Sequence, residues 1–239
     1  MATQQDLSGS VSVSNRAERR IRQLNVATSV VLILASIVLV WRVLETTTSR
    51  SDKLNPQSLT GAPAMGDPQA KVAMIVYSDF QCPFCGQFAR ETLPELNDDY
   101  VRQGKLLLSF RHLPLESIHP LAVSAALAAQ CGYDQGRFWQ VHDELFDLRG
   151  RLDMPHLLEA ATRAGVDQKT WLACMEHKDT VRIDEDVQRA RELVITATPY
   201  FLIGEVRGGR AYINRVINGA QPLSVFRRAI DRAVSQVSK

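Results

Sequence analysis

The sequence has no second Cys-x-x-Cys pair and no two histidines three to five residues apart, so a four-ligand zinc site lacks its usual donors. It also lacks a charge excess. Residues 1–50 hold six Lys and Arg against three Asp and Glu, and the remaining residues hold 22 against 23. This balance excludes a polyanion-binding function for the larger part of the chain. We therefore expect no nucleic-acid partner, no metal and no cofactor.

Long apolar runs are absent apart from one near the N-terminus. Residues 26–41 carry no charge, and four arginines lie between residues 16 and 22. Counting residues 24–44 gives 21 positions, about the length that spans a bilayer, if Arg42 reaches back to the interface. We predict one transmembrane helix at 24–44. The positive charge before it predicts a cytoplasmic tail, residues 1–23, and an extracytoplasmic C-terminal part.

A cleavable signal peptide is the alternative interpretation of this N-terminal run. More than 20 residues precede the run, however, and no A-x-A cleavage site follows it, so an uncleaved membrane anchor is favoured. Residues 45–69 are rich in Thr, Ser, Pro and Gly, which is typical of a linker. The predicted organisation is therefore a single-pass cell-membrane protein, with the linker at 45–69 and one folded domain at 70–239.

Cys82-Pro83-Phe84-Cys85 lies between an apolar, partly β-branched run at 72–77, a predicted strand, and a segment with helical spacing. In the first turn of a helix, positions i and i+3 share a face with Cβ atoms about 5–6 Å apart, which suits a disulfide. Cys82 would lie at the N-cap, where free N–H groups stabilise a thiolate, and Pro83 suits the first helical position. We predict a redox dithiol with Cys82 as the accessible nucleophile and Cys85 as the shielded resolving thiol.

Two other interpretations of this cysteine pair stay open at the level of sequence. It could be half of a zinc site, which the missing second pair disfavours. The two thiols could also be inert core residues, which their position between a strand and a helix disfavours.

The rest of the chain predicts an α/β fold. A second strand is expected at 105–110, which makes a β-α-β opening with the first. Residues from about 115 to 195 have helical patterns, with Asp153 and Asp167 as candidate N-caps, and form a predicted helical insertion. Strand patterns return at 200–203 and 211–217, separated by a Gly-Gly turn, and a final amphipathic helix is expected at 222–237.

In the order of their predicted strands and helices, residues 65–237 resemble the DsbA-like thiol:disulfide oxidoreductases of the thioredoxin superfamily. The resemblance implies a thioredoxin fold with an inserted helical domain, here preceded by the N-terminal transmembrane helix. Its most specific part is Cys-Pro-Phe-Cys followed, more than 110 residues later, by Thr-Pro before a strand. The residues that carry it are Gly66-Asp67-Pro68, Ser78 to Cys85, Arg111 to Leu115, His119-Pro120, Cys131, Phe138-Trp139, His142-Asp143 and Thr198-Pro199-Tyr200-Phe201.

The resemblance also implies roles for residues outside the dithiol. It implies that Pro199 is cis and lies against the dithiol, and that the exposed backbone of Thr198 pairs with an extended substrate. A proline has no N–H for a central ladder, so it fits at the start of a strand, and a cis bond is readily formed only before proline. An ordinary turn proline is the alternative. Cys131 and Cys174 match a structural disulfide found in some anchored members, with two buried free thiols as the alternative.

Three positions near the dithiol differ from archetypal members. Phe84 stands where those enzymes have a histidine, and Val76 stands where they have a buried acid. Asp79, three residues before Cys82, could share a proton-transfer role, but Asp serves turns so often that an exposed loop or turn-capping carboxylate is favoured.

These observations lead to one function and two alternatives. The resemblance implies an oxidase that passes its Cys82–Cys85 disulfide to reduced, unfolded secreted or cell-envelope proteins. It also implies a quinone-linked membrane protein, of the DsbB or vitamin-K-epoxide-reductase-like kind, as the reoxidant. A disulfide reductase or isomerase, or an anchored chaperone-like module that binds peptides without turnover, are the alternatives.

Overall fold

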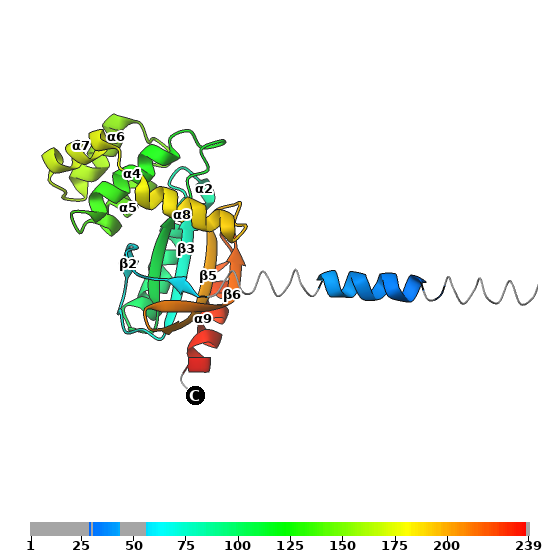
Figure 1. Cartoon of the computed structure of the whole chain (residues 1–239). Helices are drawn as coiled ribbons and strands as arrows, with labels where there is room; N and C mark the ends of the chain where they lie inside the picture. Colours follow the sequence, from blue (N-terminus) through cyan, green and yellow to red (C-terminus); the bar gives the residue numbers. More distant parts are fainter. Residues whose placement is uncertain (1–28, 30, 44–55, 238–239) are drawn as a thin grey trace, which may run out of the picture. The chain divides into compact units, whose positions relative to one another are not determined.

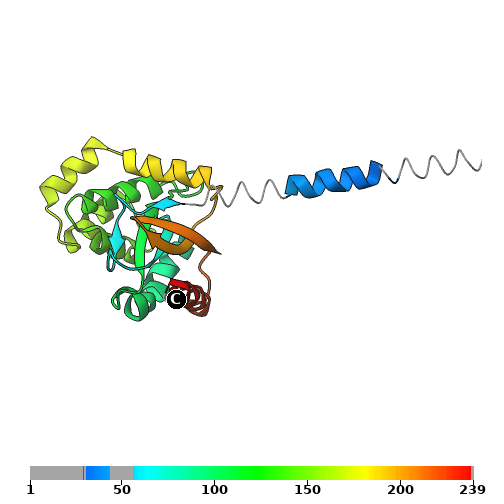
Figure 2. The same cartoon turned by 60° about the horizontal axis from the view of Figure 1, so that its bottom comes forward.

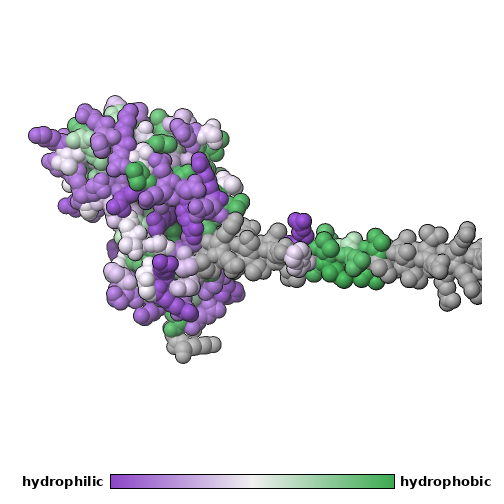
Figure 3. Space-filling view, viewed as in Figure 1, coloured by the Kyte–Doolittle hydropathy of each residue, from purple (hydrophilic) through white to green (hydrophobic). Residues whose placement is uncertain are grey.

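The computed structural model describes residues 29, 31–43 and 56–237, and the chain divides into two units, residues 1–51 and 52–239. In the first unit, residues 31–43 form a helix whose apolar side chains are exposed (Figure 3). Within the described ranges, no helix combines the length and the apolar character needed to cross a membrane. The anchor predicted at 24–44 includes residues outside the described ranges, as does the whole tail 1–23, so both stay predictions.

The second unit is built on a six-stranded sheet with the strand order β1-β6-β5-β3-β4-β2 (Figure 1). β3 and β4 are parallel, and every other neighbouring pair is antiparallel. The strands are β1 (Gln57–Ser58), β2 (Ala64–Met65), β3 (Val72–Ser78), β4 (Leu107–His112), β5 (Tyr200–Arg207) and β6 (Arg210–Asn218).

The two shortest strands lie inside the predicted linker. β1 and β2 form the two edges of the sheet, and the thiol-bearing unit therefore includes residues 56–69 rather than starting at residue 70. Two-residue strands have no periodicity that a sequence pattern could reveal. Arginines hold this segment in place: Arg111 donates to the Ser58 carbonyl and Arg182 donates to the Gly61 carbonyl.

β3 lies in the middle of the sheet because all seven of its residues are apolar or small enough to be buried on both faces. Val72, Met74 and Val76 face one core with the helices that follow the dithiol and with α9 (Leu223–Val237). The alternate residues face a second core with α8 (Val181–Glu192). Figure 2 shows these helices on opposite sides of the sheet.

The helical segment after the dithiol is not one regular α-helix. It consists of α2 (Pro83–Gln87), a π-helical stretch at Phe88–Thr92, α3 (Leu93–Leu96) and a second π-helical stretch at Asn97–Val101. Pro94 gives a physical reason for the first irregularity, because it has no N–H to donate to the carbonyl four residues earlier. Phe88, Leu93 and Leu96 are buried, whereas Phe84 is 60% exposed.

Four helices form a bundle between β4 and α8, within the region predicted to be a helical insertion. They are α4 (Ala122–Tyr133), α5 (Phe138–Asp147), α6 (Met154–Arg163) and α7 (Gln168–His177), and Figures 1 and 2 show them gathered beyond one end of the sheet. Asp153 and Asp167 accept hydrogen bonds from the N–H groups of His156 and Thr170, so both predicted N-caps are confirmed.

Candidate active site

The dithiol lies at the start of α2, at the end of the central strand β3. Cys82 is the N-cap residue of α2 and Pro83 occupies its first turn, as predicted from their order in the sequence. Cys82 and Cys85 are both free thiols in the structure. Cys82 is 6% exposed and Cys85 is 1% exposed. Cys82 is thus less accessible than expected for a residue at an open helix end, because the Thr198 segment lies against it.

The segment before β5 closes over Cys82 from the other side. The Thr198–Pro199 peptide bond is cis. The Cys82 thiol donates to the Thr198 carbonyl across 3.5 Å, although the two residues are 116 positions apart in the sequence. Thr198 was expected to be exposed, but it is buried because the dithiol loop lies on it. The hydrogen bond to the Thr198 carbonyl needs a protonated Cys82, so the carbonyl is available for peptide pairing when Cys82 is a thiolate.

The surroundings of Cys82 favour its thiolate. A hydrogen bond from the Cys85 thiol, the Thr198 side chain, and the backbone N–H groups of Cys85 and Phe84 lower the pKa of Cys82 from 9.0 to about 5, against the opposing effect of burial. Burial raises the pKa of Cys85 well above its ordinary value, and the adjacent Cys82 adds to this through its hydrogen bond and its charge. The pair therefore has one thiolate near neutral pH, and it is on Cys82.

We predict that alkylation of the reduced protein labels Cys82 with a pH midpoint near 5, while Cys85 stays unlabelled in the native state, because only Cys82 is a thiolate there. Peptide mapping after iodoacetamide pulses at a series of pH values measures both sites. First labelling at Cys85, or a Cys82 midpoint near that of an ordinary thiol, would contradict the assignment.

Asp79 is a buried member of the site: the turn-capping role predicted for it is confirmed, whereas the exposed loop position is wrong. Its Oδ1 accepts from the Gln81 N–H at 2.7 Å, which is the turn-capping role, and its Oδ2 accepts from the Leu115 N–H at 2.8 Å and lies 2.8 Å from His119 Nδ1. Its own N–H donates to Cys85 Sγ at 3.4 Å. Asp79 therefore joins the loop before the dithiol to the loop after β4, and its backbone contacts the resolving sulfur.

Sequence reasoning gave Asp79 the wrong surroundings for an identifiable reason. Its partners Leu115 and His119 lie 36 and 40 residues away, so no local pattern places them beside it. The Asp-x-Gln turn was the one local signal. Val76, where archetypal members have a buried acid, is itself buried in the apolar core.

An aromatic cluster packs behind the dithiol loop. Phe80 stacks on Phe110 at 5.4 Å between ring centroids and contacts Phe146 at 4.9 Å. His112 lies 5.1 Å from Phe110, and neither of its ring nitrogens has a hydrogen-bond partner among the described residues. Burial, with the charge of Arg111 and the neighbouring His142, lowers the pKa of His112 from 6.5 to about 3, although the Gln130 side chain acts in the opposite direction.

We predict that His112 makes the fold acid-sensitive. Below about pH 6.5 the unfolded chain protonates this histidine, whereas the folded chain does so only near pH 3, so the free energy of unfolding falls as pH drops through this window. The loss is at most about 1.4 kcal/mol per pH unit. His112→Phe should lose this slope, as measured by urea unfolding of the oxidised protein, in which Cys82 does not titrate. Parallel stability curves for wild type and variant would contradict the prediction.

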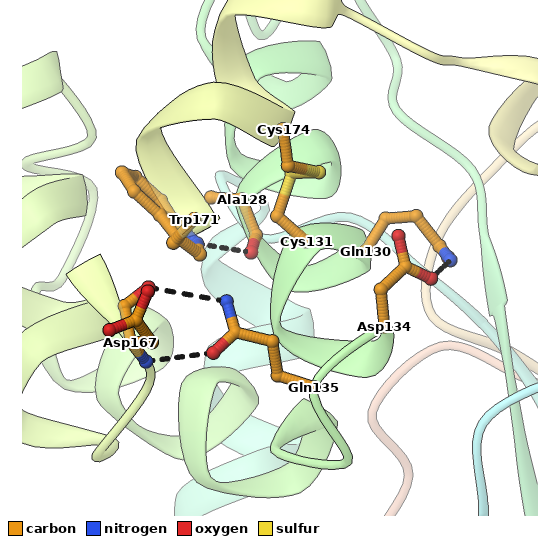
Figure 4. The surroundings of a disulfide bond; sticks show 8 residues. All are labelled: Ala128, Gln130, Cys131, Asp134, Gln135, Asp167, Trp171 and Cys174. Atoms are coloured by element: carbon orange, nitrogen blue, oxygen red, sulfur yellow. Dashed lines mark hydrogen bonds between the residues drawn. A yellow bond between two sulfur atoms is a disulfide. The ribbon is translucent and has the colours of Figure 1, made fainter. Parts of the chain in front are cut away.

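Cys131 on α4 and Cys174 on α7 form a disulfide with their Cα atoms 5.8 Å apart (Figure 4). The same two helices are joined by Trp171, whose indole N–H donates to the Ala128 carbonyl at 3.0 Å. The Gln135 side-chain amide also donates to the Asp167 carbonyl and accepts from the Asp167 N–H. This second pair of cysteines crosslinks the helical bundle and is not part of the dithiol site.

A family model described as thioredoxin matches residues 58–232. One curated relative is a Na⁺/H⁺ antiporter NhaA 1 of Salinispora arenicola. It is 35% identical over 156 residues, which cover 65% of this chain and 23% of the antiporter. This chain therefore corresponds to about a quarter of the antiporter's length. A probable disulfide bond formation protein D of Bacillus anthracis is 25% identical over 195 residues, covering 77% of this chain and 88% of that protein.

Among solved structures, α-DsbA1 of Wolbachia pipientis is similar with a TM-score of 0.67 and 26% identity, covering 78% of this chain and 96% of that one. The family model covers well over half of the chain, and the structural neighbour agrees with it. The chain therefore belongs to the thioredoxin superfamily, in its DsbA-like branch.

Proposed function

We propose that this chain is a protein-disulfide oxidase that introduces disulfides into reduced secreted or cell-envelope proteins. The observation that carries the proposal is the asymmetry of the dithiol, with the pKa of Cys82 lowered to about 5 and that of Cys85 raised. A dithiol whose thiolate is stabilised has a stabilised reduced form, so its disulfide is readily given up to a substrate. The name of the Bacillus anthracis relative agrees with this direction.

The reaction consists of two exchanges. A substrate thiolate attacks Cys82 Sγ, the Cys82–Cys85 bond breaks, and Cys85 leaves as a thiolate. The Cys85 thiolate accepts the hydrogen bond from the Asp79 N–H and is then protonated. A second substrate thiolate attacks the substrate sulfur of the mixed disulfide, and Cys82 leaves as its stable thiolate. The substrate loses two electrons as its disulfide forms, and the enzyme's dithiol holds them.

The oxidised protein, mixed with a reduced and unfolded test protein, should form disulfides at a rate that a Cys82→Ser variant does not support. A Cys85→Ser variant, mixed instead with a disulfide-bonded test protein, should accumulate mixed disulfides at Cys82, because its thiolate attacks the test protein's disulfide and no resolving thiol then releases the product. Quantification of substrate thiols and of crosslinked species on non-reducing gels measures both. Brisk insulin reduction with slow substrate oxidation would support the reductase alternative. Full biological function of Cys82→Ala would support the chaperone-like alternative.

The proposed setting is the outer face of the cell membrane, with residues 24–44 as the anchor and a quinone-linked membrane protein as the reoxidant. Support comes from the basic cluster before the apolar run and from the extracytoplasmic need for disulfides. A membrane-impermeant reductant followed by a membrane-impermeant thiol reagent, both applied to intact cells, should label Cys82. Labelling only after lysis would contradict this orientation.

A further inference from the structure

A cavity of about 170 Å³ lies directly beside Cys82, and Thr198 is not among its lining residues. Its lining includes Cys82, Gly86, Arg90, Phe146 and Arg149. The exchange reaction uses none of the last four residues. Two of them are arginines, from the helical segment after the dithiol and from the loop after α5. A substrate whose cysteine sulfur reaches Cys82 must place its neighbouring residues near these two side chains.

Arg90 is fixed in this cavity by two contacts. Its Nη1 donates to the Phe146 carbonyl at 2.7 Å. Its guanidinium also lies against Gly86, where a Cβ would come within 2.8 Å of Nη1, so the close approach depends on glycine at this position. Gly86 in turn donates its N–H to the Cys82 carbonyl. A guanidinium has five N–H donors, so one bond to Phe146 leaves the others available to a ligand.

The backbone of Arg149 is fixed by a hydrogen bond, whereas its side chain is not. It has a positive φ of 50°, and its N–H donates to the Phe146 carbonyl at 3.2 Å, so the loop that carries it is bound to the end of α5. Its guanidinium has no hydrogen bond or ion pair with any residue between 56 and 237. An unpaired cation at the wall of a cavity beside a reactive sulfur is suited to bind an anion.

A second, larger cavity of about 490 Å³ adjoins the first, since Arg90 and Phe146 line both. Its other walls include Leu93 and Pro94, and Asp143 and Asp147 lie at its α5 side. We call these two cavities together the groove. Arg90 and Arg149 line the cavity beside Cys82, whereas Asp143 and Asp147 line the other one, so the charge changes sign from one cavity to the next. An extended segment of a substrate would meet the arginines first, within two or three residues of its reacting cysteine.

We propose that this groove binds the substrate segment next to its cysteine and that Arg149, with Arg90, selects for a carboxylate side chain there. The inference rests on the proposed oxidase function and names a preference within it. Arg149 is a specificity-determining residue, since it contacts the substrate chain and takes no part in the exchange of sulfur atoms.

The test uses three peptides, each with two cysteines, that differ only at the position two residues after the first cysteine: Glu, Gln or Lys. The oxidised protein is mixed with each peptide, and peptide disulfide formation is followed by acid quenching and mass spectrometry. Each rate is divided by the rate of the same peptide with the uncharged 2-hydroxyethyl disulfide, so that the effect of the neighbouring charge on thiol reactivity cancels. We expect normalised rates in the order Glu, Gln, Lys, with about a five-fold span at low salt that shrinks as salt is added.

Arg149→Gln should bring the Glu and Lys peptides to nearly equal normalised rates. Arg228→Gln is the matched control: it removes the same charge from an exposed position on α9 that lines neither cavity, and it should keep the span. Equal rates for the three peptides with wild type, or an unchanged span in Arg149→Gln, would overturn the preference while leaving the oxidase function intact. Failure to oxidise any peptide would refute the oxidase function and the preference together.

Discussion

Replacing Asp79 with alanine is expected to lower the free energy of unfolding by about 3–5 kcal/mol, because it breaks a buried, hydrogen-bonded polar group. The Gln81 and Leu115 N–H groups and the His119 ring would lose their shared acceptor, and each buried donor left without one costs about 1–3 kcal/mol. The variant keeps the backbone N–H that donates to Cys85 Sγ, but it loses the side-chain bonds that hold this N–H in position, so the reduction potential of the dithiol should also shift.

Urea unfolding and redox equilibration with glutathione measure the two effects on Asp79→Ala. Asp79→Asn should lie between wild type and alanine in stability, since an amide oxygen can keep one or two of the three bonds. Asp153→Ala removes an exposed N-cap carboxylate and should cost only about 1 kcal/mol. A stability loss no larger than that of Asp153→Ala, with an unchanged potential, would show that Asp79 is an ordinary turn residue.

Gly204→Ala is expected to destabilise the fold by more than about 4 kcal/mol, to the point where little folded protein forms. A Cβ at this position would lie 2.0 Å from the Tyr212 carbonyl oxygen and 2.8 Å from the Ile213 Cα, both backbone atoms of β6. The strands cannot separate cheaply there, because the pairing of β5 with β6 already changes register between Ile203 and Gly204.

The consequence reaches the site because β5 begins directly after Pro199, so its register places the Thr198 carbonyl at Cys82. Gly208→Ala is the comparison: Gly208 has a positive φ but nothing within 4 Å of its Cβ position, so only the backbone strain of about 1–2 kcal/mol should appear. Thermal unfolding of both variants measures the difference. Similar melting temperatures would mean that β6 yields to the added methyl group.

The sequence predicted those parts of the fold whose signals are local. β3 is a short apolar run, the predicted helix at 222–237 corresponds to α9, and Pro83 marks the first turn of α2, so their patterns could be interpreted without knowledge of the neighbours. The β4 prediction was shifted, since Lys105 and Leu106 precede the strand and Arg111 and His112 extend it. The apolar residues marked the strand, but its ends depend on pairing with β3.

The remaining features depend on contacts between distant segments. β1 joins the sheet only through β6, more than 150 residues later. Arg90 and Arg149 come together through the carbonyl of Phe146, which no spacing in the sequence reveals. The dithiol was predictable because Cys82 and Cys85 are three residues apart. The position of Pro199 against the dithiol was expected from family resemblance alone, and the hydrogen bond from the Cys82 thiol to the Thr198 carbonyl was not predicted.

The reduction potential of the Cys82–Cys85 pair tests the oxidase proposal most directly. The lowered pKa of Cys82 stabilises the reduced form, while the missing histidine at Phe84 removes a further source of stabilisation available to archetypal members. Equilibration with glutathione buffers should therefore give a potential between about −120 and −230 mV, at or below that of DsbA and above thioredoxin's roughly −270 mV. A potential near thioredoxin's, accompanied by rapid insulin reduction, would contradict the oxidase direction.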